Sequence, residues 1–205
     1  LAGAPKHALS HVANGVDIII AQGYEAGGHT GEIASMVLTP DIVDAVGPDV
    51  PVLGAGGIGS GRQVAASLAL GAQGVWTGSI WLGTEEYRNL SANHSAWETA
   101  FTRATSADTV RTRVYTGKPA RLLKTKWTEA WAEEGAPEPL PMPLQNLLVA
   151  EAHNRIVASN DPDVISMPVG QIVGRMNEVR PVADVMASLV AEFEEAVAAL
   201  NKVNG

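Results

Sequence analysis

The chain has 205 residues, of which 46% are hydrophobic, and this is enough for one globular domain with an appendage. Its formal net charge of −8 argues against a nucleic-acid or anionic membrane surface, because phosphate contacts require clustered lysines and arginines. Cysteine is absent, which excludes disulfides and thiolate chemistry and agrees with a cytoplasmic location, and no apolar run reaches the roughly 20 residues of a membrane span.

The first 84 residues predict three buried strands. The run "VDIIIAQ" (residues 16–22) is continuous, apolar and rich in β-branched residues, which is typical of a strand that is buried on both faces. The segments "VPVLGAGG" (50–57) and "QGVWTGS" (73–79) have the same character. All three are followed by glycine-rich segments or small turn residues.

Helices are predicted between these strands. A short helix covers 5–13, and a second begins with Thr39 as N-cap and Pro40 at its first position and stops at Gly47. A third begins after Ser60. Because strands and helices alternate, we expect a parallel sheet built from βαβ units.

The second half of the chain predicts mainly helices. They include 96–105, "RLLKTKWTEAWAEEG" (121–135) and 144–161, with a proline-rich break at 136–143. The last stretch repeats apolar residues at 182, 185, 189, 193, 197 and 200, which predicts an amphipathic helix that packs on a core.

Glycine-rich turns after parallel strands meet at one edge of the sheet, where α/β proteins bind ligands. The turn "GAGGIGSG" (54–61) precedes a helix and offers backbone N–H groups to an anion, and the helix dipole adds to the attraction. The turn Thr77-Gly78-Ser79 adds hydroxyl groups. Tight turns that bind no ligand are the alternative interpretation.

His29 is the best candidate for acid–base catalysis. It lies in "YEAGGHTGE" (24–32), where glycines let the backbone approach a ligand closely, and an imidazole changes charge near neutral pH. Glu25 and Glu32 flank it, and either could orient the ring or simply be solvated. The other four histidines (His7, His11, His94 and His153) fit helix surfaces better, and no metal site is predicted.

Four ordered motifs resemble the nitronate monooxygenase family and its relative, the flavin-dependent enoyl-ACP reductase of bacteria. They are "GVDIIIAQGYEAGGHTG", "VPVLGAGGIGSGRQVAASLALGAQGVWTGSIW", "YTGKPARLLKT" and "MPVGQIVGRM", and together they cover nearly the whole chain. The resemblance implies a TIM barrel with a helical part and non-covalently bound FMN.

By the same resemblance, His29 is the catalytic base, and a set of residues binds the cofactor. Gln22, Gly27 and Gly28 would lie beside the flavin ring, and Gly56, Gly57, Gly78 and Ser79 would hold the phosphate. Ala55, Thr77 and Gln171 complete the implied cofactor site, since they lie within the matching motifs.

The resemblance also shows departures. The family's first barrel strands have no counterpart here, so the expected fold is α/β: the C-terminal part of a TIM (β/α)₈ barrel, about its last three strands, with an appended helical region. We divide the chain into the barrel portion (1–84), a helical insertion or appendage (85–165) and a C-terminal segment that packs back on the barrel (166–205). The length of the appendage suggests a larger substrate, such as an acyl thioester.

The first functional hypothesis is an FMN-dependent oxidoreductase that oxidises alkyl nitronates with dioxygen. The second is an NAD(P)H-dependent flavin reductase of an unsaturated acyl-CoA or acyl-ACP thioester, and the third is an inactive flavin-fold binding protein. The expected partners are a small-molecule substrate, dioxygen or NAD(P)H, and the remaining N-terminal part of the barrel, with no nucleic acid and no membrane. A homodimer is left open.

Overall fold

The computed structural model describes residues 1–90 and 94–203. These form two compact units. The parallel-sheet unit contains residues 1–26, 30–78 and the chain from 180 onward, and the antiparallel-sheet unit contains 27–29 and 79–179. Each unit is described by itself.

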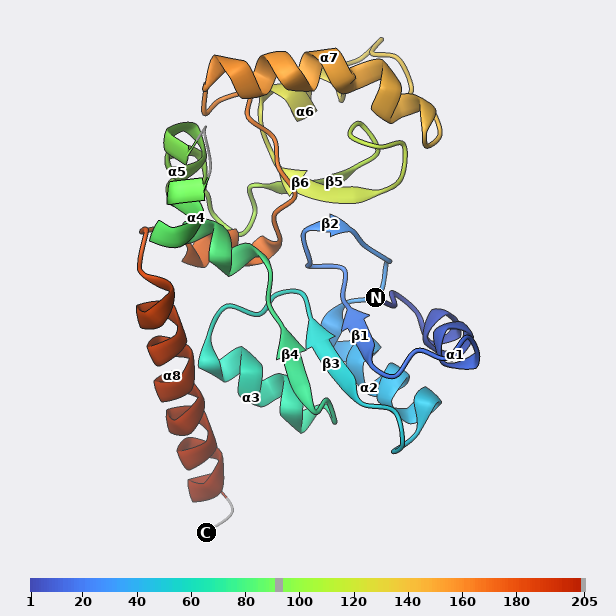
Figure 1. Ribbon diagram of the computed structural model, residues 1–205, viewed down its shortest axis with the longest axis vertical. Coiled ribbons are helices and arrows are strands. Elements are labelled where there is room, and N and C mark those ends of the chain that lie inside the picture. The colour runs from blue at the N-terminus through green and yellow to red at the C-terminus, as the bar shows by residue number, and fades with distance from the viewer. Residues whose placement is uncertain (91–93, 204–205) are drawn as a thin grey trace. The chain divides into compact units, whose positions relative to one another are not determined.

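Three short parallel strands form the sheet of the first unit. They are β1 (Ile19–Gln22), β3 (Val52–Ala55) and β4 (Gly74–Trp76), in the spatial order β1-β3-β4 (Figure 1). On the other edge of β1, Ala21 pairs in parallel with Ala2. The predicted parallel α/β arrangement of this part of the chain is confirmed.

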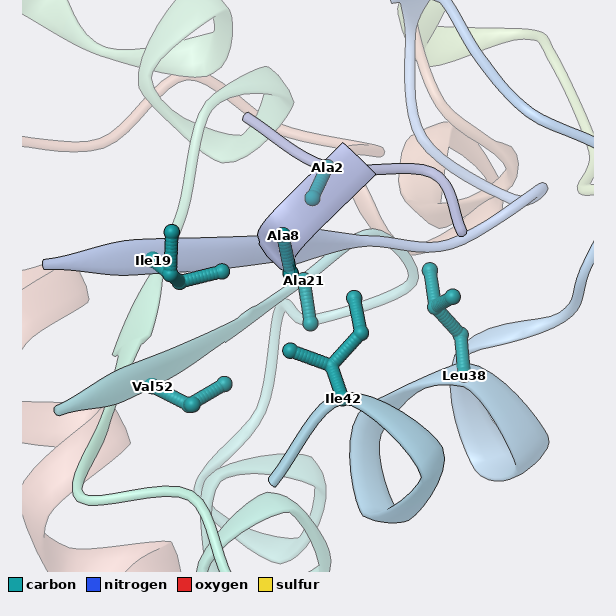
Figure 2. Packing of buried hydrophobic residues seen from close by; sticks show 7 residues of the cluster. All are labelled: Ala2, Ala8, Ile19, Ala21, Leu38, Ile42 and Val52. Carbon is teal, nitrogen blue, oxygen red and sulfur yellow. The ribbon is translucent and has the colours of Figure 1, made fainter. Parts of the chain in front are cut away.

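Four helices accompany this sheet, and two of them cover its apolar core. They are α1 (Pro5–Ala13), α2 (Ser35–Val46), α3 (Gly61–Ala69) and α8 (Val182–Val203). Figure 2 shows Ile42 and Leu38 of α2 pointing toward the side chains of β1, β3 and α1. The core consists of fully buried Ala2, Ala8, Ile19, Ala21, Leu38, Ile42 and Val52. The terminal helix α8 packs on α3, where the backbone of α8 approaches Gly61 so closely that a side chain there would overlap it.

Two expectations about this unit are wrong in detail. Helix α2 begins at Ser35 rather than after Thr39, so Pro40 lies inside it and Thr39 is buried. The start is set by Glu25, whose carboxylate accepts the Ser35 N–H at 3.0 Å and the Ser35 hydroxyl at 2.8 Å. Strand β1 is also shorter than predicted, since Ile18 is 52% exposed and precedes it.

The second unit has a small antiparallel sheet in the order β2-β6-β5. Its strands are β2 (Gly28–His29), β5 (Thr109–Thr112) and β6 (Ala120–Leu123). The unit also contains α4 (Glu85–Leu90), α5 (His94–Thr102), α6 (Lys126–Ala130) and α7 (Leu144–Ser159), which are labelled in Figure 1. Two short 3-10 helices, η1 (Ser79–Gly83) and η2 (Gln171–Arg175), belong to it as well.

The helix predicted over 121–135 is wrong for its first part. Residues 120–123 form the central strand β6, and all four of its side chains are buried. The strand pairs with β2 on one side and β5 on the other, so non-local hydrogen bonds decide its conformation. Only Lys126–Ala130 is helical in this stretch. The division into 1–84, 85–165 and 166–205 stays a prediction.

None of the helices within residues 1–90 and 94–203 is long and apolar enough to cross a bilayer. Nor does that part of the chain bring together three or more histidine, cysteine or acidic side chains that could hold a metal ion.

Candidate functional site

The parallel strands end side by side. Gln22 at the end of β1 is in register with Ala55 at the end of β3, and Ala55 is in register with Trp76 at the end of β4. Thr77 and Gly78 follow directly. Five sequence-predicted residues, namely Gln22, Ala55, Gly56, Thr77 and Gly78, therefore lie at one edge of this sheet, as the βαβ pattern predicts.

The glycines at this edge differ in why they must be glycine. Gly56 has a φ of +94°, and a Cβ there would lie 3.1 Å from Ala26, so contacts within the protein already explain it. Gly57 has a φ of +70°, but its Cβ position meets Glu25 only at 3.6 Å. Gly78 has nothing within 4 Å of its Cβ position. A Cβ at Gly57 would thus lie in ordinary contact with Glu25, whereas Gly78 leaves open space, and neither glycine is required by close packing, so a ligand could approach the backbone at both.

The N-terminus of α3 contributes less to an anion site than its sequence suggested. The Gly61 N–H donates to the Glu192 carboxylate of α8 at 2.9 Å, and the Gly59 N–H donates to the Gln63 side chain at 2.9 Å. These two N–H groups thus already donate to side chains of the protein, one of which is a carboxylate. The turns at Gly57 and Gly78 remain the better candidates for binding a phosphate.

Three predicted residues of the other unit meet at the segment 169–171. A Cβ on Gly27 would lie 2.7 Å from the carbonyl carbon of Val169, so this glycine is required by close packing. The Gly170 N–H donates to the Ser79 hydroxyl at 2.9 Å, and Gln171 follows as the first residue of η2. Gly27, Ser79 and Gln171 are therefore brought together, although they are far apart in sequence.

His29 lies on β2 and is exposed. One of its ring nitrogens is hydrogen-bonded to a residue that the sequence did not indicate. Its Nε2 is 2.6 Å from the Thr116 hydroxyl, and Thr116 is 9% exposed. The neighbouring Gly28 has a φ of +77°, and its Cβ position meets only Pro168, at 3.9 Å. The hydrogen bond fixes the rotation of the imidazole, and Gly28 leaves open space beside it.

Thr116 was missed although it lies inside the segment "YTGKPARLLKT". Its distance from His29 in the sequence is 87 residues, and the strand pairing that joins them is non-local. A threonine before a Gly-Lys-Pro turn carries no local signal for contact with a histidine. The carboxylate of Glu25, one of the two acidic residues that flank His29 in the sequence, accepts the Ser35 N–H at the start of α2.

His153 is not the helix-surface residue that was expected. It is half-buried on α7, with its ring centroid 4.7 Å from that of Tyr115 and 5.5 Å from that of Trp127. Burial lowers the pKa of His153 below its ordinary value, so the ring in this aromatic cluster is neutral at neutral pH. Nε2 of His11, on α1, lies 3.2 Å from the Leu1 carbonyl oxygen.

Comparisons with known proteins agree with the motifs. A family model described as nitronate monooxygenase matches residues 1–192. A Mycobacterium tuberculosis protein named "Putative monooxygenase" is 51% identical over 206 residues, which cover 98% of this chain and 54% of that protein. This chain thus spans about half the length of that relative.

Two solved structures have the same fold over nearly the whole chain. Nitroalkane oxidase from Streptomyces ansochromogenes superposes with a TM-score of 0.82 at 33% identity and covers 97% of this chain and 58% of its own. FabK from Thermotoga maritima superposes with a TM-score of 0.82 at 31% identity and covers 98% of this chain and 62% of its own.

Proposed function

The chain belongs to the nitronate monooxygenase family, whose members are flavin-dependent oxidoreductases, and from this premise we propose that it is part of an FMN-dependent enzyme that oxidises alkyl nitronates with dioxygen. The observation that carries the proposal is the placement of His29. An imidazole held by a buried threonine, beside a glycine with open space, suits a base that acts over a flat cofactor.

The residues present fit a flavin phosphate. Gly57 and Gly78 would offer backbone N–H groups to it, because neither Cβ position is filled by the protein. Gln22, at the end of β1, would lie beside the ring system, and Gly27, Gly28, Ala55, Gly56, Thr77, Ser79 and Gln171 would complete the site. The flavin supplies the electron transfer, and the protein supplies position and proton transfer.

His29 would take the proton from the carbon next to the nitro group of a neutral nitroalkane. Thr116 would hold the ring while the proton moves, since its hydroxyl is hydrogen-bonded to Nε2. With a nitronate, which has already lost that proton, the same imidazole would orient the nitro oxygens instead. A positioned general base is worth roughly 10²–10⁴-fold in rate.

The second candidate is an NAD(P)H-dependent reductase of an unsaturated acyl thioester. Its support is the likeness to FabK, which equals the likeness to nitroalkane oxidase in TM-score. Residues 79–179, with their own sheet, would then form the binding surface for a long substrate. The third hypothesis, an inactive binding protein, is disfavoured because His29 has a placed partner in Thr116.

We further propose that the rest of the barrel comes from residues outside this chain. The described residues hold three parallel strands, whereas a (β/α)₈ barrel has eight and typically takes about 250 residues. The chain covers 54% of the Mycobacterium tuberculosis relative and 62% of FabK, and these shares support the proposal. A cytoplasmic location and a homodimer stay predictions.

Oxygen uptake and cofactor mass test the proposal together. We expect the intact protein to release FMN on denaturation, identified by mass, and to consume dioxygen with a primary alkyl nitronate without added NADH. Turnover of an unsaturated acyl thioester with NADH, and none of the nitronate, would favour the reductase instead. Release of no flavin would contradict both.

A further inference from the structure

The hydroxyl of Thr116 is placed by the loop that carries it, residues 113–118, which we call the Thr116 loop. The Gly117 N–H donates to the Arg113 carbonyl at 2.8 Å, and the Arg113 side chain donates back to the Gly117 carbonyl at 3.0 Å. The Lys118 N–H donates to the Thr116 hydroxyl at 3.3 Å. The position of this hydroxyl therefore depends on the conformation of the whole loop.

One side chain of α7, that of Gln145, is hydrogen-bonded to the Thr116 loop. Gln145 is fully buried, and its Nε2 donates to the Val114 carbonyl at 2.9 Å. Its Oε1 accepts the Leu140 N–H at 2.9 Å. A flipped amide would place its NH₂ group against the Leu140 N–H and its oxygen against the Val114 carbonyl, both in a buried place. A single orientation of the amide is therefore favoured.

Two further contacts join the same elements. Gly117 has a φ of +86°, and a Cβ there would overlap the backbone of Leu140 and Met142, so the Thr116 loop and the segment 140–142 that leads into α7 meet backbone against backbone. The Tyr115 ring packs against the His153 ring of α7, with the two ring centroids 4.7 Å apart. The residues on both sides of Thr116 are thus tied to α7 or to the segment that leads into it.

We propose that Gln145 is a positioning residue for His29, acting through Val114 and the hydroxyl of Thr116. The proposal rests on the proposed role of His29. Without the Gln145 amide, the Val114 carbonyl loses its buried donor, and the Thr116 hydroxyl moves relative to the imidazole. Misplacement by about 1 Å far from the reacting atoms can cost on the order of 10²-fold in rate.

A double-mutant cycle tests this in the intact protein. Gln145→Met keeps the size and apolar stem but removes both hydrogen bonds, and we expect kcat on a neutral nitroalkane to fall roughly 10- to 100-fold with flavin content and KM unchanged. Thr116→Val should give a similar loss. Because both act on one contact, the double variant should be no slower than Thr116→Val alone.

The control is Val149→Ala on the same buried face of α7, where Val149 is 2% exposed. It should lower the thermal midpoint of unfolding without lowering kcat. Gln145→Leu serves if Gln145→Met does not fold, since leucine also removes the donor to the Val114 carbonyl. We expect it to lower kcat as Gln145→Met does.

A spectroscopic readout separates this proposal from the proposed function. In the ¹⁵N NMR spectrum, the ring nitrogens of His29 should shift in Thr116→Val and shift in the same direction in Gln145→Met, whatever the substrate. Unchanged His29 signals in Gln145→Met, or losses in kcat that multiply in the double variant, would overturn the positioning role. If His29 proves to have no catalytic role, the NMR comparison still tests whether Gln145 positions its ring.

Discussion

Replacing His29 with asparagine in the intact protein is expected to lower the rate of proton abstraction from a neutral nitroalkane by roughly 10²–10⁴-fold. Because His29 is exposed and asparagine is polar and smaller, fold and flavin content should be retained, although asparagine is too short to replace the contact between Nε2 and the Thr116 hydroxyl. The loss should be smaller with the nitronate, which needs no proton removed. Turnover with both forms of the substrate, followed from pH 5 to 9, measures the difference.

The matched control is His7→Asn, which changes an exposed histidine on α1 in the other unit. It should leave both activities unchanged. If His29→Asn were as active as the wild type on every substrate, His29 would be an ordinary exposed residue, and the assignment of the catalytic base would fail.

The second large effect is expected at Gly57. Gly57→Ala should weaken flavin retention by roughly 10- to 100-fold, because a Cβ at this turn enters the space where the phosphate would meet the backbone. Part of any effect could come from strain, since φ is +70° at this residue. The flavin dissociation constant, measured by fluorescence titration of the apoprotein, gives the size of the loss.

Two variants separate the phosphate contact from backbone strain. Gly47→Ala has the same strain, with a φ of +75° and an open Cβ position, but lies at the end of α2 and should keep the flavin. Gly78→Val has open space and no positive φ, and should lose flavin without loss of stability. Equal flavin affinity in Gly57→Ala, Gly78→Val and Gly47→Ala would place the phosphate elsewhere.

The parallel sheet was predictable because its signals are local. Each of its strands is an apolar run followed by glycine or small turn residues, and this pattern does not depend on other parts of the chain. The start of α2 was not predictable in this way. Its cap comes from Glu25, ten residues earlier, and a side chain that caps from outside the helix outweighs the Thr39-Pro40 signal.

The antiparallel sheet and the partner of His29 depend on contacts that no local pattern reveals. The residues "ARLL" of β6 suit a helix or a strand, and pairing with β2 and β5 decides between them. Thr116 meets His29 only because that pairing brings the loop next to β2. His29 itself was found because it stands among glycines, which is a feature of the sequence alone.

The central claim, nitronate oxidation, is tested most directly by identifying which compound reduces the flavin. The intact protein should be mixed without oxygen, first with a primary alkyl nitronate and separately with NADH, while the flavin absorbance is followed by stopped-flow. We predict prompt bleaching by the nitronate alone and none by NADH. Prompt bleaching by NADH, with the nitronate inert, would contradict nitronate oxidation and identify a reductase.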